Sequence, residues 1–97
     1  MNSGEAKVVL VTAGARRVGA SIVRELHASG DRIVIHCRDS QGEATSLAEE
    51  LNAIRPDSVA VFTADLKDAS GREALIESAV SRWGRLDALV NNASTFY

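Results

Sequence analysis

The stretch KVVLVTAGARRVGASIV, residues 7–23, joins an apolar run to a helical pattern through a turn that holds two glycines and two adjacent arginines. Its first six residues, Lys7 to Thr12, are rich in β-branched side chains, as in a strand of a parallel sheet that is covered on both faces. Val18, Ile22 and Leu26 then recur at every fourth position, which predicts one buried stripe of an amphipathic helix. The stretch therefore predicts a strand, a turn and a helix.

Three further apolar runs repeat this unit along the chain. They are RIVIHC (Arg32 to Cys37), VAVFTA (Val59 to Ala64) and LDALVNN (Leu86 to Asn92), at intervals of about 25 to 30 residues, the length of one strand-helix unit. Helical spacing returns between them, with apolar residues at Ala44, Leu47, Ala48, Leu51 and Ile54, and at Leu75, Ile76, Ala79, Val80 and Trp83. Each helical pattern predicts one buried stripe.

Residues with strong local preferences mark the helix ends. Ser40 with Glu43 and Ser70 with Glu73 have the spacing of capping boxes, and Gly84 follows the third helical pattern. The resulting order, β-α-β-α-β-α-β, predicts an α/β fold with a parallel sheet and right-handed crossovers. We expect half of a Rossmann-type doubly wound sheet, with four strands in the order 3-2-1-4 and three helices, and we treat residues 1–97 as one incomplete dinucleotide-binding domain.

Composition and charge disfavour several other classes of protein. The chain of 97 residues is 45% hydrophobic and 25% charged, as globular domains are, and its formal net charge of -2 argues against a nucleic-acid groove. No run approaches the roughly 18 apolar residues of a membrane span, and the polar amino terminus lacks the apolar core of a secretory leader, so we expect no membrane association and a cytoplasmic location. Cys37 is the single cysteine, and His27 and His36 lack the spacing of metal ligands. We therefore expect no disulfide and no metal site, and we interpret both histidines as structural.

The turn at Ala13 to Gly19 connects the first strand to the first helix at the carboxyl edge of the predicted sheet. A helix N-terminus at this edge offers unpaired backbone N–H groups and a positive dipole end, which suit a pyrophosphate. Gly14 and Gly19 would let the backbone turn tightly and approach such a ligand. The alternative is an ordinary strand-to-helix turn, because the spacing G-x-G-x-x-G is absent.

The second strand ends at Cys37, Arg38, Asp39 and Ser40, where dinucleotide-binding folds select their cofactor. An arginine here can bind the 2′-phosphate of NADPH, and Ser40 adds a hydroxyl at the start of the second helix. Asp39 would repel that phosphate if its carboxylate pointed inward, or would have no effect if it pointed to solvent. The residues favour NADPH, and the alternative is that Arg38 is a solvated surface charge and Ser40 only a helix cap.

The segment GRLDALVNNAS, residues 84–94, closely resembles the motif G-x-h-D-h-h-h-N-N-A-G (h, apolar) of the short-chain dehydrogenase/reductase family, with serine in the last place. Within that family, TAGARRVG (residues 12–19) and NNASTFY (residues 91–97) are most similar to the pteridine reductases. The chain departs from the family at one place, because Ala13 stands where glycine is usual and Gly14 where alanine is common. If position 13 needs a positive φ, alanine there is strained.

The resemblance implies roles in binding NADPH for the positions that match. Arg17 would contact the cofactor phosphates and the substrate, and the backbone N–H of Val18 would bond the diphosphate. Asp65 would accept a hydrogen bond from the adenine amino group, with Ala64 and Leu66 beside it in contact with the cofactor. The alternative for Asp65 is that it caps the third helix.

The last residues of the chain are implied to carry the substrate end of the site. Asn92, Ala93 and Ser94 would line the ribose and the nicotinamide, whereas Asn91 would tie the fourth strand to its neighbours. Ser94 would also bond the substrate, and Phe96 would stack on a flat pterin ring. The alternative for Phe96 is ordinary core packing.

Members of the family use a Tyr-x-x-x-Lys pair for proton transfer. The only tyrosine here is Tyr97 and the only lysines are Lys7 and Lys67, so we assign no catalytic residue and expect this chain to be inactive alone, as the amino-terminal part of a reductase. The missing strands and helices would leave the sheet bare near its first and fourth strands, so we expect the chain alone to be marginally stable and to self-associate. We expect the complete protein to be a homo-oligomer, a tetramer or a dimer.

Three functions fit the sequence. The resemblance favours an NADPH-dependent pteridine reductase whose substrate is a small molecule, a pterin or a dihydrofolate-like ring. A carbonyl-reducing member of the same family, such as a 3-oxoacyl-thioester reductase, fits every residue up to Asn92 equally well. The third reading is a nucleotide-binding module without catalysis, which acts through a partner.

Overall fold

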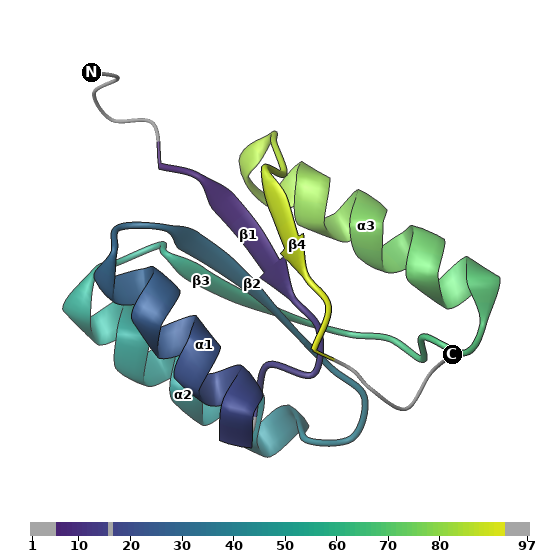
Figure 1. Ribbon diagram of the computed structural model, residues 1–97, viewed down its shortest axis with the longest axis horizontal. Helices are drawn as coiled ribbons and strands as arrows, with labels where there is room; N and C mark the ends of the chain where they lie inside the picture. Colours follow the sequence, from purple (N-terminus) through teal and green to yellow (C-terminus); the bar gives the residue numbers. More distant parts are fainter. Residues whose placement is uncertain (1–5, 16, 93–97) are drawn as a thin grey trace.

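The computed structural model describes residues 6–15 and 17–92, and it contains four strands and three helices in strict alternation. The elements are β1 (Val8–Val11), α1 (Arg17–Ala28), β2 (Arg32–Cys37), α2 (Gln41–Ile54), β3 (Val59–Thr63), α3 (Ala69–Trp83) and β4 (Ala88–Val90). The strands form one parallel sheet in the order β3-β2-β1-β4. Helices α1 and α2 lie together on one side of the sheet and α3 lies apart from them on the other (Figure 1). The predicted α/β fold and strand order are confirmed.

The two faces of the sheet carry alternate residues of the central strands. Val9, Val11, Ile33 and Ile35 pack with buried residues of α1 and α2. Val8, Leu10 and Val34 pack with Leu75 and Ala79 of α3. Because both faces of β1 and β2 are covered, these strands are nearly continuous in apolar residues, as the sequence indicated.

The predicted buried stripe of α1 is wrong by one position. The buried residues are Gly19, Val23 and His27, whereas Val18 is 64% exposed and Ile22 and Leu26 are only partly buried. Gly19 faces inward because the first turn of the helix packs against the preceding turn. The predicted stripe missed this face because it was drawn from apolar residues, and glycine and histidine are not counted among them.

Further details of the helices also differ from the predictions. Ile76 and Val80, expected in the buried stripe of α3, are each 39% exposed, because only Leu75 and Ala79 of this helix are buried against the sheet. Ile54, the last residue of α2, is 70% exposed, because the helix ends there and its final turn extends past the packed stripe of Ala44, Leu47, Ala48 and Leu51. Neither expected capping box forms as predicted. Ser40 occupies the N-cap position of α2, but its side chain makes no cap hydrogen bond.

At α3 the cap is Asp68, whose carboxylate accepts from the Ser70 N–H at 3.2 Å and from its hydroxyl at 3.1 Å. Ser70 therefore lies within the helix rather than before it, because an aspartate two residues earlier satisfies the unpaired N–H. Gly84 ends α3 as predicted, in a left-handed conformation with φ of 79°.

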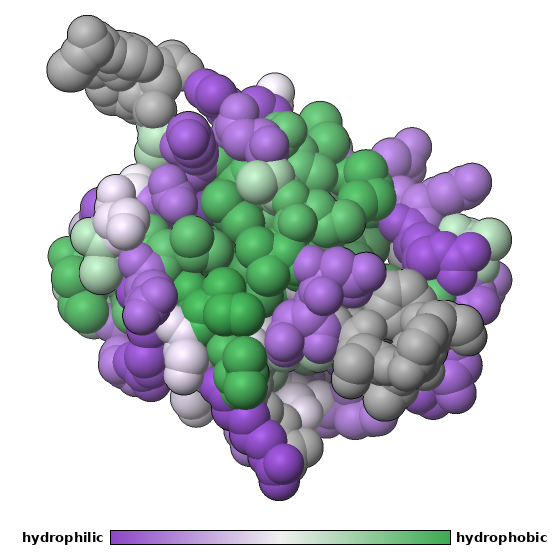
Figure 2. Space-filling model, viewed as in Figure 1, coloured by the Kyte–Doolittle hydropathy of each residue, from purple (hydrophilic) through white to green (hydrophobic). Residues whose placement is uncertain are grey.

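The sheet is bare at β4 in the part of the chain that the structure describes, whereas all four residues of β1 are buried. Ala88 and Leu89 of β4 are exposed, Leu89 by 51%. Figure 2 shows a continuous apolar surface across the middle of this view, in the region where Figure 1 draws β4. The expectation of an uncovered apolar region is therefore confirmed at β4 and wrong at β1, because α3 on one face and α1 with α2 on the other already cover that strand.

Two buried histidines link the helices and strands. His27 Nε2 lies 2.8 Å from the Ser58 hydroxyl, and burial together with the nearby Arg55 guanidinium lowers the pKa of His27. Burial likewise lowers the pKa of His36, against a weaker opposing effect of its bond to the Ala64 carbonyl. Both rings are therefore neutral at pH 7 and contribute to the core as uncharged groups.

Acidification is expected to destabilise the protein through these histidines. Below about pH 6.5 the histidines of the unfolded chain bind protons, whereas those of the folded protein stay neutral. The free energy of unfolding is therefore highest above this pH. It decreases as the pH drops further, by at most about 1.4 kcal/mol per pH unit for each histidine. Urea unfolding of the full-length gene product at pH 7.5 and 5.5 measures this loss. The loss should shrink in a His27→Gln variant, and an equal loss in variant and parent would contradict the assignment.

Candidate functional site

The carboxyl ends of the four parallel strands place four short segments at one edge of the sheet. These are the turn after β1 and the residues that follow β2, β3 and β4. The Ala13 N–H donates to His36 Nδ1 at 2.9 Å, the Ala64 N–H to the Cys37 carbonyl at 3.2 Å, and Asn92 Nδ2 to the Ala13 carbonyl at 3.2 Å. The predicted site segments are thus in direct contact with one another as far as Asn92.

Thr12 fixes the end of β4 against the end of β1. Its hydroxyl oxygen accepts from the Asn92 N–H at 2.8 Å and lies 3.2 Å from Asn91 Oδ1, and the Thr12 N–H donates to the Val90 carbonyl at 3.0 Å. Thr12 itself is buried. Asn91 therefore ties β4 to its neighbour, as the sequence predicted.

Gly19 allows α1 to approach the turn after β1. A Cβ atom on Gly19 would lie 2.2 Å from the Ala13 carbonyl oxygen and 2.8 Å from Asn92 Nδ2, so a side chain does not fit there. A Cβ on Gly14 would meet the Val11 carbonyl at 3.1 Å, a tight contact but a milder one. The two predicted glycines therefore shape the turn through close approach.

Ala13 adopts a left-handed conformation in this turn, with φ of 53°. It is the residue that stands where the family pattern usually has glycine. Alanine in this conformation costs about 1–2 kcal/mol relative to its usual backbone. The strain that the sequence anticipated is therefore present. The surrounding contacts must compensate for it.

Arg17 and Val18 begin α1, and both are exposed beside the turn. Arg17 also has a positive φ, of 50°. The first turn of the helix contains no acidic residue, so the positive end of the helix dipole is not compensated from within it. This electrostatic pattern fits the phosphates of a dinucleotide.

The residues after β2 present a cation and an anion to solvent. Arg38 Nε lies 3.8 Å from Asp39 Oδ2, and the two side chains are 54% and 86% exposed. An exposed pair at this separation is weak. The Asp39 carboxylate therefore points to solvent, and Ser40, half-buried, follows at the start of α2.

Cys37 is buried, in contrast to its neighbours. Burial raises the pKa of its thiol and the Asp39 carboxylate adds to this effect, so the thiol is neutral at pH 7. Cys37 takes part in this edge through its backbone carbonyl, which accepts from Ala64.

After β3, Asp65 is exposed and Leu66 is buried in the core beside α3. Asp65 Oδ1 accepts from the Lys67 N–H at 3.0 Å, which fixes the start of the turn. Because Asp68 caps α3, the alternative role of Asp65 as the helix cap is wrong. Asp65 leaves an exposed carboxylate at the same edge as Arg38.

The remaining predicted residues, Ala93, Ser94 and Phe96, lie outside the described residues. Their roles therefore stay predictions. Within residues 6–15 and 17–92, no group of three or more His, Cys, Asp or Glu side chains is placed to hold a metal ion. In the same ranges, no helix is both long enough and apolar enough to cross a membrane.

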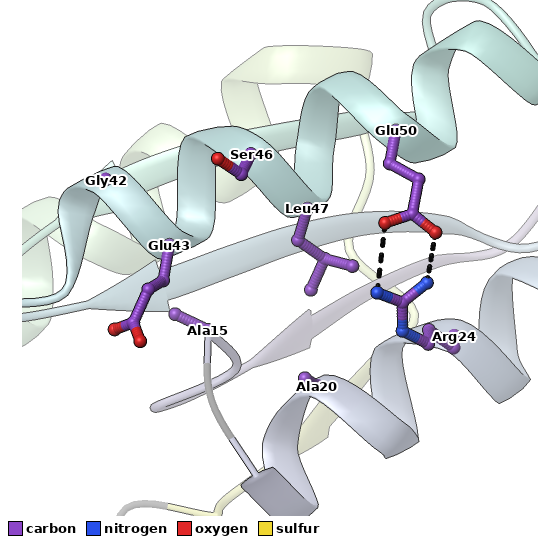
Figure 3. Close-up of a pocket in the computed structure, with 8 residues that line it drawn as sticks. All are labelled: Ala15, Ala20, Arg24, Gly42, Glu43, Ser46, Leu47 and Glu50. Atoms are coloured by element: carbon purple, nitrogen blue, oxygen red, sulfur yellow. Dashed lines mark hydrogen bonds and ion pairs between the residues drawn. The ribbon is translucent and has the colours of Figure 1, made fainter.

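A pocket of about 430 Å³ that the sequence did not predict lies between α1 and α2 (Figure 3). Its lining residues are Ala15, Ala20, Arg24, Gly42, Glu43, Ser46, Leu47 and Glu50. Arg24 and Glu50 form a two-point ion pair across it, with one contact at 3.0 Å. None of the residues predicted to bind the cofactor lines this pocket, so it is separate from the predicted site.

The sequence also missed the contacts of His36. Its ring touches both the turn after β1 and the segment after β3. The available signal was its position, next to last in a strand whose carboxyl end faces the predicted site. A polar residue there can act on the site although it is buried.

Comparison with known proteins adds independent information. A model of the short chain dehydrogenase family matches residues 7–96. Pteridine reductase 1 of Leishmania tarentolae is 39% identical over 112 residues, covering 98% of this chain and 39% of that protein. The 3-oxoacyl-[acyl-carrier-protein] reductase FabG of Staphylococcus aureus is 38% identical over 87 residues, and L-rhamnose 1-dehydrogenase (NAD(P)(+)) of Azotobacter vinelandii is 41% identical over 90, each covering 90% of this chain and 35% of the relative. The chain thus spans less than two fifths of the length of each of these relatives.

Proposed function

Because the chain belongs to the short-chain dehydrogenase/reductase family, we propose that it is the amino-terminal, cofactor-binding part of an NADPH-dependent pteridine reductase. The observation that carries the proposal is the contact between the two segments that resemble pteridine reductases. Asn92, in the NNAS segment, donates to Ala13, in the arginine-bearing turn. This contact supports the proposal that both segments line one site.

The described residues fit a dinucleotide on physical grounds. Because Gly19 has no side chain, the first turn of α1 lies directly against the turn after β1. The unpaired N–H groups at the start of this helix are thus available to a pyrophosphate bound beside the turn. Arg38, half-exposed, can bind a 2′-phosphate, and Asp65 can accept from the adenine amino group. Asn92 would hold the ribose end, while its Nδ2 supports the turn.

In the complete protein the bound NADPH would supply a hydride to the substrate ring. The residues of this chain would bind and orient the coenzyme. Arg17, at the exposed start of α1, would contact its phosphates and the substrate. Ser94 and Phe96 would bond and stack the pterin. Because the chain spans 39% of the pteridine reductase that it matches, we also propose that the exposed apolar region at β4 packs against the rest of the protein.

The proposal is tested by turnover. The full-length gene product is mixed with NADPH and dihydrobiopterin, and loss of the nicotinamide absorbance band is followed. Oxidation of NADPH that depends on the pterin supports a pteridine reductase, and its absence contradicts it.

The resemblance to 3-oxoacyl reductases favours carbonyl reduction as a second candidate function. A 3-oxoacyl thioester assayed in parallel distinguishes the two, since only the matching substrate should accelerate NADPH oxidation. NADPH binding without turnover of either substrate would instead support a nucleotide-binding module without catalysis.

A further inference from the structure

His36 is buried at 3% exposure and both of its ring nitrogens are engaged. Nδ1 accepts from the Ala13 N–H at 2.9 Å, and Nε2 lies 2.9 Å from the Ala64 carbonyl oxygen. A nitrogen that accepts a hydrogen bond carries no proton, so the proton is on Nε2 and is donated to Ala64. The two contacts therefore require a neutral ring in this one tautomer.

The ring acts on the strained residue of the turn. Ala13 has φ of 53°, and its N–H is held by the His36 ring while its carbonyl is held by Asn92 Nδ2. The next residue, Gly14, donates its N–H to the His36 carbonyl at 3.0 Å. His36 thus supplies two of the hydrogen bonds that keep this turn in its left-handed shape.

The turn after β1 also sets the position of α1. The Ala13 carbonyl is the atom that a Cβ on Gly19 would meet at 2.2 Å, so the first turn of the helix rests directly against it. A rotation of Ala13 toward an ordinary backbone conformation would move that carbonyl. It would also change the direction of the N–H groups at the start of α1.

We propose that His36 is a positioning residue for the cofactor turn: its ring holds Ala13 in the left-handed conformation and links this turn to the end of β3. The inference rests on the proposed function, in which the turn binds the coenzyme phosphates. Its consequence is that an alanine can stand where the family usually has glycine.

Two variants separate the two contacts of the ring. In His36→Asn, Oδ1 stands where Nδ1 stood and can still accept from Ala13, but the bond to Ala64 is lost. In His36→Gln, the amide nitrogen stands where Nε2 stood and can still donate to Ala64, but the bond to Ala13 is lost. Both variants remove the imidazole from the same buried place, so their melting temperatures should fall by similar amounts.

The two histidine variants should differ in the affinity of the full-length protein for NADPH. We expect the dissociation constant of His36→Asn to stay within about threefold of the parent and that of His36→Gln to rise about tenfold, the size of one hydrogen bond. Adding Ala13→Gly to His36→Gln should restore most of the affinity, because glycine adopts a positive φ without strain. Equal weakening in both histidine variants, or no recovery in the double variant, would overturn the proposal.

Amide hydrogen exchange at Ala13 and Gly14 in the protein without NADPH gives a readout that does not depend on cofactor binding. Exchange should accelerate about tenfold in His36→Gln and little in His36→Asn. If the parent protein bound no NADPH, the proposed function would fail, while the exchange rates would still decide whether His36 holds the turn. Equal exchange in the two variants would show that it does not.

Discussion

A Gly19→Ala variant should lose about 1–3 kcal/mol of folding free energy, the range for overpacked sites, and its affinity for NADPH should fall at least tenfold. The added Cβ would lie 2.2 Å from the Ala13 carbonyl oxygen and 2.9 Å from the Gly14 Cα, and both are backbone atoms that cannot rotate away. The helix must then shift outward from the turn. Chemical denaturation and a fluorescence titration with NADPH on the full-length protein measure the two effects.

Gly42→Ala is the matched control for this change. Gly42 lies in the first turn of α2, and a Cβ there would have nothing within 4 Å. The same added methyl group should therefore leave NADPH binding unchanged and raise stability by up to about 1 kcal/mol, because alanine favours a helix. Equal losses of NADPH affinity in Gly19→Ala and Gly42→Ala would show that close approach at Gly19 does not matter for the cofactor.

An Arg38→Ala variant should lose discrimination between the two nicotinamide coenzymes. A hydrogen bond to a charged group contributes about 1.5–3 kcal/mol, so the dissociation constant for NADPH should rise about 10- to 100-fold, while that for NADH, which lacks the 2′-phosphate, should stay within about threefold. Parallel titrations with NADPH and NADH measure the ratio.

Arg24→Ala is the control, because the Arg24 side chain is 49% exposed, close to the 54% of Arg38, yet it pairs with Glu50 across the pocket between α1 and α2. It should leave both dissociation constants unchanged. Asp39→Asn should strengthen NADPH binding about two- to threefold, since it removes an exposed negative charge beside Arg38. An Arg38→Ala variant that weakens NADPH and NADH equally would place the 2′-phosphate elsewhere.

The arrangement of the strands could be predicted from the sequence because buried parallel strands leave a strong signal. Each of the four predicted runs contains a strand, and β2 has the predicted bounds, Arg32–Cys37. The order of the strands follows from handedness and from the fold family rather than from any single residue. The bare region beside β4 followed from the same rules.

The details at helix ends could not be predicted with the same success. The stripe of α1 passes through Gly19 and His27, which an apolar pattern does not count, and the capping residue of α3 is Asp68 rather than Ser70. Such choices depend on tertiary contacts, here the contact of Gly19 with the turn and the side-chain bond from Asp68.

The candidate site, too, could be predicted only in part from the sequence. Exposed residues after the strands, such as Arg38 and Asp65, could be proposed as site residues because the predicted fold puts them at one edge of the sheet, where the structure also has them. His36 was interpreted as structural because nothing in the sequence shows which atoms its ring meets. The strain at Ala13 was anticipated only through the family pattern, and φ of 53° confirms that this position is left-handed.

The most direct test of a cofactor site at this edge is a map of backbone amide chemical shifts in the isotopically labelled full-length protein as NADPH is added. Large shifts are predicted for Ala13, Gly14, Val18, Arg38 and Asn92. Gly30 and Gly84, which precede β2 and β4 at the opposite edge, should not move. Shifts confined to the pocket between α1 and α2 or to the opposite edge, with the turn at Ala13 unmoved, would contradict the assignment.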